Sequence, residues 1–412
     1  MCIKEKVKEA KHSEDRIVNG AFMPEWRRRI GEDRNVRYIT SLSQIPQLPP
    51  EERERLQKVA DTFGFRTNSY YLSLVNWDDP KDPIRRLIIP DPEELEDVTT
   101  LLDASHEAAI TVAPGCEHKY SNTALILLSK VCGAVCRFCF RKRIFMPDNT
   151  EVSPNLEPAY EYIRNHPEID NVLLTGGDPL MLSTRKIASV LHNLRAIPHV
   201  KIIRFGSKLP AFNPFRFIDD DELLDLFEMH SHPDKRIYVV SHFNHPREIS
   251  EVAIQAIELL LKRGIIIINQ TPLLIGINDD ADTLGELCTK LAQVGVAPYY
   301  VFQCRPTRGN AHFKTSMVRG VDLTEAAKRQ GSGLAKRFRY AGSHASGKIE
   351  IIGYDDKYQY FRYHQSKDPR HYGRFFRLPR KDEATWWDDW MPNGESFTIE
   401  DCPDVELGSG SP

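Results

Sequence analysis

The sequence shows no sign of a disulfide framework, a membrane span or a secretion signal. Its 412 residues include only eight cysteines, too few and too clustered for a disulfide-stabilised protein of this size. The longest aliphatic run, GIIIIN at 264–269, is far too short to cross a bilayer. The N-terminal stretch MCIKEKVKEAKHSED has no apolar signal-peptide core. We therefore expect a cytoplasmic protein that makes no membrane contact.

The chain also lacks an excess of charge of either sign. The 55 Lys and Arg residues nearly balance the 58 Asp and Glu residues, giving a formal net charge of −3. This balance does not indicate nucleic acid or an anionic membrane as a partner. The hydrophobic content of 41% is ample for a large core, in one large domain with appendages or in two domains.

Short aliphatic runs recur along the middle of the chain, with helix-like segments such as STRKIASVLHNLRAI between them. Runs of this length, rich in Ile and Val, indicate buried parallel strands in βα units. Six units favour an α/β fold with a partial, TIM-like (β/α)6 barrel, and a doubly wound open sheet is the competing topology. The runs are TALILLS (123–129), NVLLTGG (171–177), VKIIRFGS (200–207), RIYVVSHF (236–243), GIIIINQTPLL (264–274) and PYYVFQC (298–304).

The two ends of the chain differ in composition from these units. The first part is polar, and its segment PDPEELEDVTTLLDAS is typical of an amphipathic helix with an acidic first turn. The last part is aromatic and charged. We predict a mainly helical N-terminal region at 1–110, a core barrel at 111–350, and a C-terminal extension at 351–412 that packs on the body or on another subunit.

Polar, small or basic residues follow the predicted strands, in TGGD, RFGSK, SHFNHP, NQTP and QCRPTRGN. In a parallel α/β domain the carboxyl ends of the strands and the loops after them form the active-site face. One such loop would be an ordinary soluble connection, but five together predict a large site on this face.

A cluster of three cysteines, Cys132, Cys136 and Cys139, follows the first predicted strand. A structural zinc site normally takes four protein ligands, and no fourth Cys or His lies close by in the sequence. Iron–sulfur clusters usually take four cysteines, so three would leave one iron open to bind a small molecule. The other five cysteines are scattered and are interpreted as ordinary residues.

The motif CGAVCRFC resembles the C-x3-C-x-aromatic-C signature of the radical S-adenosylmethionine (SAM) superfamily. In that superfamily the open iron of a 4Fe–4S cluster chelates the methionine part of SAM, and one electron from the cluster releases a deoxyadenosyl radical. The resemblance implies three cluster ligands, an aromatic residue against the adenosyl group, and a Gly-Gly-acid motif that receives the SAM amino group. These positions are Cys132, Cys136, Cys139, Phe138, Gly176, Gly177 and Asp178.

Further motifs narrow the resemblance to the lysine 2,3-aminomutase family. The order and spacing of these motifs resemble those of the family over about residues 110 to 350. The motifs are CRFCFRKR, LLTGGDPL, RFGSK, SHFNHPREI, NQTPLLIGIND, PYYVFQC and AHFKT. Members of that family also carry pyridoxal phosphate (PLP), and they move the amino group of an amino acid from C2 to C3. The resemblance thus implies an isomerase with a 4Fe–4S cluster, SAM and PLP, and it adds His242 and Gln270 to the cofactor contacts.

PLP needs a lysine to which it attaches covalently. The family's lysine follows a small, Gly-rich run, and GSHASGKIEIIGY puts Lys348 in that place. The family's phosphate contacts are a basic residue, a tyrosine and, three residues later, an arginine. Here HKYSNT supplies Lys119 and Tyr120, but Thr123 replaces the arginine, which leaves Lys119 and Ser121 to compensate.

The residues implied in substrate binding depart from the family pattern. Arg141, two residues after the cysteine cluster, is the implied partner of the substrate carboxylate. Lysine-specific members hold the side-chain ammonium with two aspartates, and here Arg305 and Ala341 (or Gly342, with a one-residue gap) stand there. An ammonium facing Arg305 would bring like charges together, so we predict an acidic substrate such as glutamate. If Arg305 instead pairs with a protein carboxylate, this inference fails.

Several functions remain open from the sequence alone. The alternatives are lysine 2,3-aminomutase proper, modification of a protein-bound lysine, an iron–sulfur redox or sensor protein, and a zinc module. The family's C-terminal zinc-binding cysteines are missing, since only Cys402 lies beyond Cys304, and we predict no structural zinc. We expect a free amino acid substrate, an electron donor such as flavodoxin or ferredoxin, a homo-oligomer, and no nucleic acid partner.

Overall fold

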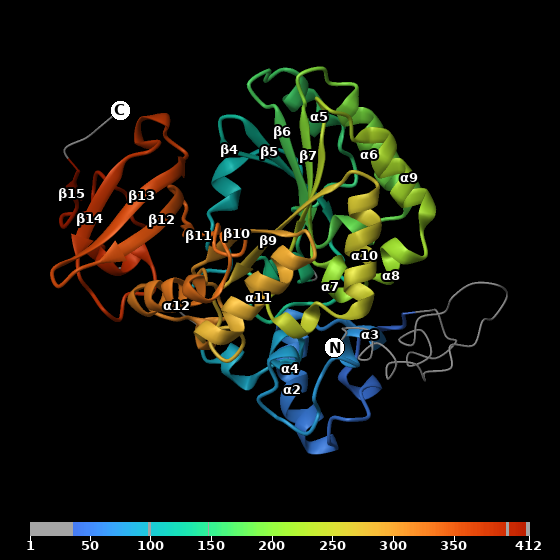
Figure 1. Cartoon of the computed structure of the whole chain (residues 1–412), viewed down its shortest axis with the longest axis horizontal. Coiled ribbons are helices and arrows are strands. Elements are labelled where there is room, and N and C mark those ends of the chain that lie inside the picture. The colour runs from blue at the N-terminus through green and yellow to red at the C-terminus, as the bar shows by residue number, and fades with distance from the viewer. Residues whose placement is uncertain (1–35, 98–99, 147, 393–394, 409–412) are drawn as a thin grey trace, which may run out of the picture. The chain divides into compact units, whose positions relative to one another are not determined.

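One mixed sheet runs through the described part of the chain (Figure 1). The computed structural model describes residues 36–97, 100–146, 148–392 and 395–408. From one edge to the other the strands follow in the order of the sequence, β3 to β15, so each strand pairs with the next along the chain. Among the described residues, no helix is both long and apolar enough to span a membrane.

The middle of the sheet consists of parallel strands, and all six predicted strands are confirmed. They are β5 (Thr123–Ser129), β6 (Asn171–Gly176), β7 (Ile202–Ser207), β8 (Ile237–Ser241), β9 (Ile266–Pro272) and β10 (Ala297–Phe302). A further strand, β11 (Arg339–Ser343), also pairs parallel to β10. The sequence did not predict β11, because RYAGS is short and contains no aliphatic run.

Helices connect the parallel strands and cover their outer face (Figure 1). Their bounds are α5 (Glu157–Arg164), α6 (Thr184–Arg195), α7 (Leu209–Phe212), α8 (Phe215–Ile218), α9 (Asp221–His230), α10 (Glu251–Lys262), α11 (Ala281–Gln293) and α12 (Met317–Gln330). Five of them begin after a side chain that accepts a backbone N–H, the usual N-cap: Ser183, Asp220, Ser250, Asp280 and Ser316.

The two faces of the parallel strands differ in character. On β7, Ile203 and Phe205 are fully buried, whereas Arg204 and Gly206 line a cavity. Successive side chains of a strand point to opposite faces, so the apolar set packs under the helices and the other set faces the cavity. The fold thereby places polar groups on the inner face without exposing the core.

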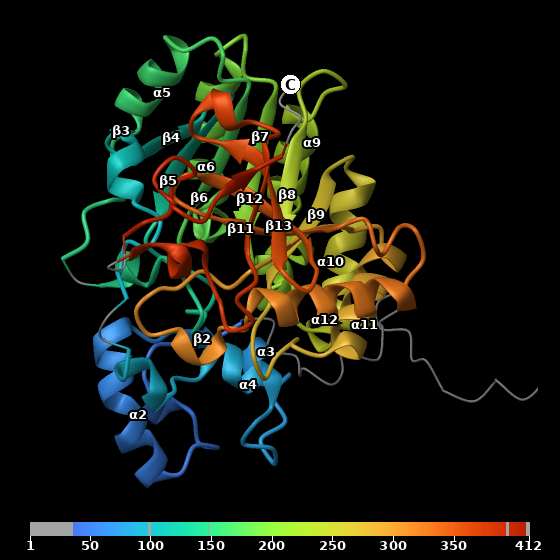
Figure 2. The same ribbon diagram turned by 90° about the vertical axis from the view of Figure 1, so that its left-hand side faces the viewer.

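Antiparallel strands extend the sheet at both edges. The edge strands are β3 (Thr111–Ala113) and β4 (Cys116–Tyr120) at one end, and β12 (Gly347–Tyr354), β13 (Tyr358–Ser366), β14 (Phe375–Pro379) and β15 (Glu406–Leu407) at the other. Figure 2 shows β11, β12 and β13 side by side. The boundary predicted at 350/351 falls inside β12, so this C-terminal part continues the sheet, and its core includes Trp387, Phe361 and Phe376.

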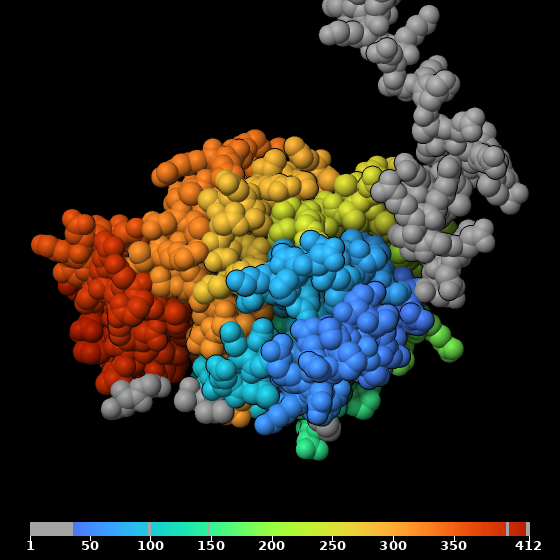
Figure 3. Space-filling view, turned by 90° about the horizontal axis from the view of Figure 1, so that it is seen from below, coloured from blue at the N-terminus to red at the C-terminus, as the bar shows by residue number. Residues whose placement is uncertain are grey.

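The N-terminal elements lie at the carboxyl ends of the parallel strands (Figure 1). Seen from below, their atoms, in blue, cover part of the molecule's surface (Figure 3). These elements are β1 (Tyr38–Ile39), α2 (Pro50–Phe63), β2 (Thr67–Asn68), α3 (Ser69–Leu72) and α4 (Pro83–Ile88). The amphipathic helix predicted at PDPEELEDVTTLLDAS was wrong for the described residues, where only the 3-10 helix η2 (Pro92–Leu95) forms. The reason lies in Glu94, which turns inward instead of toward solvent.

Glu94 joins this N-terminal part to the loop that carries the three cysteines. Its carboxylate accepts two hydrogen bonds of 2.8 Å from Arg137 and one of 2.7 Å from Lys142. All three side chains are fully buried. Burial alone would raise the pKa of Glu94, but the positive charges of Arg137 and Lys142 lower it, so the carboxylate stays ionised.

Replacing Glu94 with Ala should destabilise the protein by about 3–5 kcal/mol, because two buried cations would lose their partner. Urea unfolding measures this free energy. The matched control is Glu51→Ala on the exposed side of α2, for which we expect a change within about 0.5 kcal/mol. Equal effects of the two substitutions would show that the Glu94 contacts do not hold the fold together.

Candidate active site

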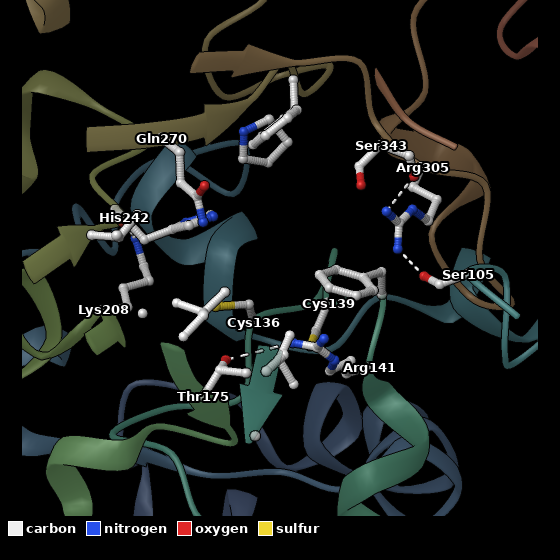
Figure 4. A pocket seen from close by; sticks show the side chains of 18 of the residues that line it. Ser105, Cys136, Cys139, Arg141, Thr175, Lys208, His242, Gln270, Arg305 and Ser343 are labelled. Atoms are coloured by element: carbon white, nitrogen blue, oxygen red, sulfur yellow. Dashed lines mark hydrogen bonds between the residues drawn. The ribbon is translucent and has the colours of Figure 1, made fainter. Parts of the chain in front are cut away.

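A cavity of about 370 Å³ opens on the inner face of the parallel strands (Figure 4). Every residue that the sequence assigned to a site, except Ser121, lines this single cavity, although the assignments came from seven separate stretches of chain. They are Lys119, Tyr120, Cys132, Cys136, Phe138, Cys139, Arg141, Gly176, Gly177, Asp178, His242, Gln270, Arg305 and Lys348. The structure thus confirms that these residues lie together, while their individual roles stay predictions.

The three cysteines lie on the loop between β5 and the 3-10 helix η4 (Lys142–Phe145), and all are free thiols. Among the described residues, no group of three or more His, Cys, Asp or Glu side chains is arranged to hold a single metal ion. In an iron–sulfur cluster the thiolates bind to the cluster as a whole, and three soft donors on one cavity wall suit that group.

The two glycines at the end of β6, Gly176 and Gly177, allow this loop to approach the sheet. The Gly177 N–H donates to the carbonyl of Ser129 at 2.5 Å, and the Asp178 N–H donates to that of Val131 at 2.8 Å. A Cβ atom on Gly177 would lie 2.6 Å from the Val131 oxygen, which is impossible without moving the backbone. Gly177 is therefore needed for close packing, whatever it contacts in a ligand.

The Asp178 carboxylate is already engaged by protein groups. It accepts hydrogen bonds from the Ser207 hydroxyl at 2.9 Å and from the backbone N–H groups of Lys208 at 2.9 Å and Leu180 at 3.0 Å. Burial raises the pKa of Asp178 to about 6, although these hydrogen bonds act to lower it. Its carboxylate thus ties the ends of β6 and β7 together, and its predicted contact with the SAM amino group stays a prediction.

Phe138 and His242 form a flat wall of the cavity. Their rings are nearly parallel, with centroids 5.9 Å apart and an angle of 13°. Burial, with the nearby positive charge of Lys208, lowers the pKa of His242 to about 4. The imidazole is therefore neutral near pH 7, and the wall offers an uncharged aromatic surface suited to a planar ligand.

Lys348 on β12 points its ammonium nitrogen at the cavity, 4.4 Å from the centre of the Tyr300 ring. Burial, followed by the charges of Arg204 and Arg305, lowers the pKa of Lys348 to about 7. A large fraction of this amine is therefore unprotonated at neutral pH. An unprotonated, desolvated lysine amine is the nucleophile that a carbonyl cofactor requires.

Lys119 lies in the same group of cations. Burial, then the charges of Arg305 and Lys348, lowers the pKa of Lys119 to about 7, and its amine donates to the backbone carbonyl of His344. Tyr120 and Ser343 also line this part of the cavity. Because the cations repel one another, an anionic ligand such as a phosphate would stabilise their charged forms.

Arg305 is held in the cavity without a carboxylate partner. Its guanidinium donates to the Ser105 hydroxyl and to the Ser343 carbonyl, and lies 4.5 Å from the centre of the Phe140 ring. Among the described residues, no carboxylate forms an ion pair with it. Burial lowers the pKa of Arg305 to about 10, so it still carries its charge at neutral pH.

The positions of the two family aspartates therefore carry different groups here. Arg305 lines the cavity, whereas Ala341 is fully buried and Gly342 packs against Trp387. Ser343, the next residue on β11, is the one that reaches the cavity. No acid at these positions can hold an ammonium group.

Arg141, by contrast, is paired with protein carboxylates. Its guanidinium forms a 2.7 Å ion pair with Glu107 and lies 3.8 Å from Glu117. Burial would raise the pKa of Glu107, but Arg141 and Arg143 lower it to about 2. Burial raises the pKa of Glu117 to about 7, because Arg141 only partly offsets it.

Four charged residues of the cavity were missed from the sequence: Arg204, Lys208, Glu107 and Glu117. Arg204 and Lys208 belong to the RFGSK motif and were not given roles. Lys208 forms a 2.5 Å ion pair with Glu248. Glu117 shares a face of β4 with Lys119, so strand alternation contained a signal for it. Glu107 begins the 3-10 helix η3 (Glu107–Ile110), and no sequence pattern indicated that it lines the cavity.

The comparisons with known proteins agree with this site. A protein of Aquifex aeolicus, provisionally named L-lysine 2,3-aminomutase, is 53% identical over 87% of this chain and 96% of its own length. The L-lysine 2,3-aminomutase of Acetoanaerobium sticklandii is 34% identical over 77% of this chain and 76% of its own length. The glutamate 2,3-aminomutase of Clostridioides difficile is 35% identical over 72% of this chain and 69% of its own length.

Two other comparisons are weaker. No family model matches the chain. A solved radical SAM methyltransferase from Sphaerobacter thermophilus aligns with a TM-score of 0.35 and 15% identity over 55% of this chain and 68% of its own. The extent and identity of the aminomutase matches establish that the chain belongs to the lysine 2,3-aminomutase family.

Proposed function

We propose that this protein is a 2,3-aminomutase for a free α-amino acid with an acidic side chain, such as glutamate. The observation that carries the proposal is the buried, charged Arg305 in the cavity, which has no ion-pair partner among the described carboxylates. As a member of its family the enzyme is an isomerase that uses a 4Fe–4S cluster, SAM and PLP.

The fold proposed for this activity is a partial barrel of six βα units, β5 to β10. Sequential parallel pairing and helices on one face support it. We assign residues 111–350 to the core that carries the site, with extensions on both sides. Exposed apolar residues on the last strands, among them Phe375 and Leu407, support a subunit contact there in a homo-oligomer. The electron donor is proposed to be a flavodoxin or a ferredoxin.

The cofactors divide the chemistry among them. When bound, the cluster and SAM supply a deoxyadenosyl radical, and PLP supplies the π system that stabilises a substrate radical. Cys132, Cys136 and Cys139 would hold the cluster, and Phe138 and His242 would flank the adenosyl group. In the view of Figure 4, His242 and Gln270 lie on one side of the cysteines, and Arg141 and Arg305 on the other.

The other residues of the cavity bind and orient. Lys348 would hold PLP, because a large fraction of its amine is unprotonated at neutral pH. Lys119, Tyr120 and Ser343 would contact the phosphate, in place of the arginine that Thr123 replaces. Arg141 would bind the α-carboxylate and Arg305 the side-chain carboxylate. Two fixed cations define both ends of a dicarboxylate substrate and keep its Cβ in one place.

The cluster assignment predicts different effects for different cysteines. Replacing Cys132, Cys136 or Cys139 with Ala should abolish SAM cleavage and strongly reduce bound iron, because each removes a thiolate ligand. Cys288→Ala and Cys402→Ala are the controls, since both residues are buried away from the cavity. Iron and sulfide content after anaerobic reconstitution gives the answer. A control substitution that lost as much iron would disprove the assignment.

The PLP assignment predicts that Lys348→Ala loses the yellow absorbance of bound PLP and retains that of the iron–sulfur cluster. In the wild type, borohydride reduction and peptide mapping should find the pyridoxyl group on Lys348. The rate of attachment should rise with pH through about 7, the pKa of this amine, because only the unprotonated amine reacts. Lys262→Ala, at an exposed position on α10, is the control. Label on a different lysine would refute the assignment.

The substrate proposal predicts that glutamate, or another amino acid with an acidic or neutral side chain, is turned over well above lysine. A buried charge without its partner costs about 3–5 kcal/mol. At roughly 1.4 kcal/mol per factor of ten, the preference is on the order of a hundredfold to a few thousandfold in kcat/KM. Competitive turnover of the two amino acids by the reconstituted enzyme measures it.

Arg305→Asp should weaken glutamate turnover and admit some lysine, though one aspartate does not rebuild a site of two. The competing function is lysine 2,3-aminomutase proper, the name that the Acetoanaerobium sticklandii relative bears. If the wild type turns over lysine in preference to glutamate, the enzyme is a lysine 2,3-aminomutase. Arg305 then does not bind the side chain of the substrate.

A further inference from the structure

The guanidinium of Arg141 has one edge occupied by protein. Its Nε donates to the two carboxylate oxygens of Glu107 at 3.0 and 3.1 Å, and its Nη2 donates to Glu107 at 2.7 Å. Its Nη1 lies 3.5 Å from the Thr175 hydroxyl. Figure 4 shows this Nη1 side of Arg141 turned toward Thr175 and the cavity. The bidentate contact expected with a substrate is thus made instead with Glu107, and Nη1 remains for a ligand.

A second carboxylate competes for the same guanidinium. Glu117 lies 3.8 Å from Nη2 of Arg141 and also lines the cavity. Glu107 in turn accepts a hydrogen bond from Arg143 as well, which fixes its own position. Without Glu107, Arg141 would turn to Glu117, and its Nη1 would leave the position that faces Thr175.

We propose that Glu107 is a positioning residue that orients Arg141 so that Nη1 meets the α-carboxylate of the substrate. The inference rests on the proposed aminomutase function but not on the choice of glutamate, because every α-amino acid carries this carboxylate. Glu107 has no contact with the substrate in this scheme. It acts through Arg141 alone.

Glu107 acts on substrate binding in two opposite ways. Its negative charge repels the α-carboxylate of the substrate, whereas its orientation of Arg141 favours binding of that carboxylate. Glu107 is shared between two cations, Arg141 and Arg143, and Arg143 is also paired with Glu151 at 2.8 Å. The repulsion that Glu107 exerts on a substrate is therefore largely compensated by its arginines. The loss of orientation is not compensated by any group, so removal of Glu107 should weaken binding.

The test compares two ligands on three variants without turnover. The ligands are the α-amino acid that the wild type binds best and the corresponding amine that lacks the α-carboxylate. The variants are Glu107→Ala, Glu107→Gln, and the control Glu151→Gln, which touches Arg143 but not Arg141. Dissociation constants come from the change in PLP absorbance, with SAM and reductant left out.

Glu107→Ala should weaken binding of the amino acid by about tenfold or more, the size of a lost charge-assisted hydrogen bond. Binding of the amine should change by less than about twofold. Glu107→Gln, which keeps an acceptor oxygen, should restore most of the amino acid affinity, and Glu151→Gln should resemble the wild type. Such selectivity and rescue would not arise from a merely structural role.

Equal weakening of both ligands by Glu107→Ala, or no weakening of either, would overturn the proposal. If Glu107→Ala does not fold, Glu107→Asp decides, because it keeps the charge but withdraws the carboxylate by one methylene. It must show the same selective loss, and a loss shared by both ligands would refute the inference. A wild type that binds no amino acid at all would instead refute the proposed function, which is a different result.

Discussion

The buried carboxylate of Glu94 is the contact on which the position of the cysteine loop depends. It pairs with Arg137 and Lys142, which flank Cys139 in the sequence, and all three side chains are shielded from water. In a desolvated setting such a carboxylate is strongly destabilising unless both cations meet it in good geometry. The loop is therefore held in one position against the N-terminal elements, and the three thiols face the cavity.

The cavity itself is organised by an imbalance of charge. Arg141 is paired with Glu107. Burial and the charge of Arg305 lower the pKa of both Lys119 and Lys348, and none of these three cations forms an ion pair with a carboxylate of the described residues. Buried cations of this kind repel one another, and anionic ligands offset that repulsion on binding. A phosphate and a side-chain carboxylate would supply the missing negative charge, and a cationic side chain would add to the imbalance. The same physical feature suits PLP and is the basis of our proposal that the substrate is acidic and not lysine.

Much of this arrangement could be predicted from the sequence. Aliphatic runs such as TALILLS gave the parallel strands, because buried strands in βα units have a distinct local composition. The rule that sites lie at the carboxyl ends of such strands brought the distant residues Cys132 and His242 to one face, whereas Lys348 came from the family resemblance alone.

The errors have a common physical cause, which is dependence on distant partners. PDPEELEDVTTLLDAS has a helical pattern, yet Glu94 turns inward because Arg137 and Lys142 stand 43 and 48 residues away along the chain. The short strand β11 exists because β10 and β12 pair with it on both sides. The partnership of Glu107 with Arg141 joins residues 34 apart, and no local pattern contains such information.

The central claim, that the enzyme moves the amino group of an acidic amino acid from C2 to C3, can be tested directly. The protein, reconstituted anaerobically with iron, sulfide, PLP and SAM, would be reduced and given glutamate labelled with heavy nitrogen. Nuclear magnetic resonance would then follow the label. The account predicts a product in which the labelled nitrogen is bonded to C3. Two results together would contradict it. SAM would be cleaved without any such product from an acidic or neutral amino acid, and lysine would give a β-amino product.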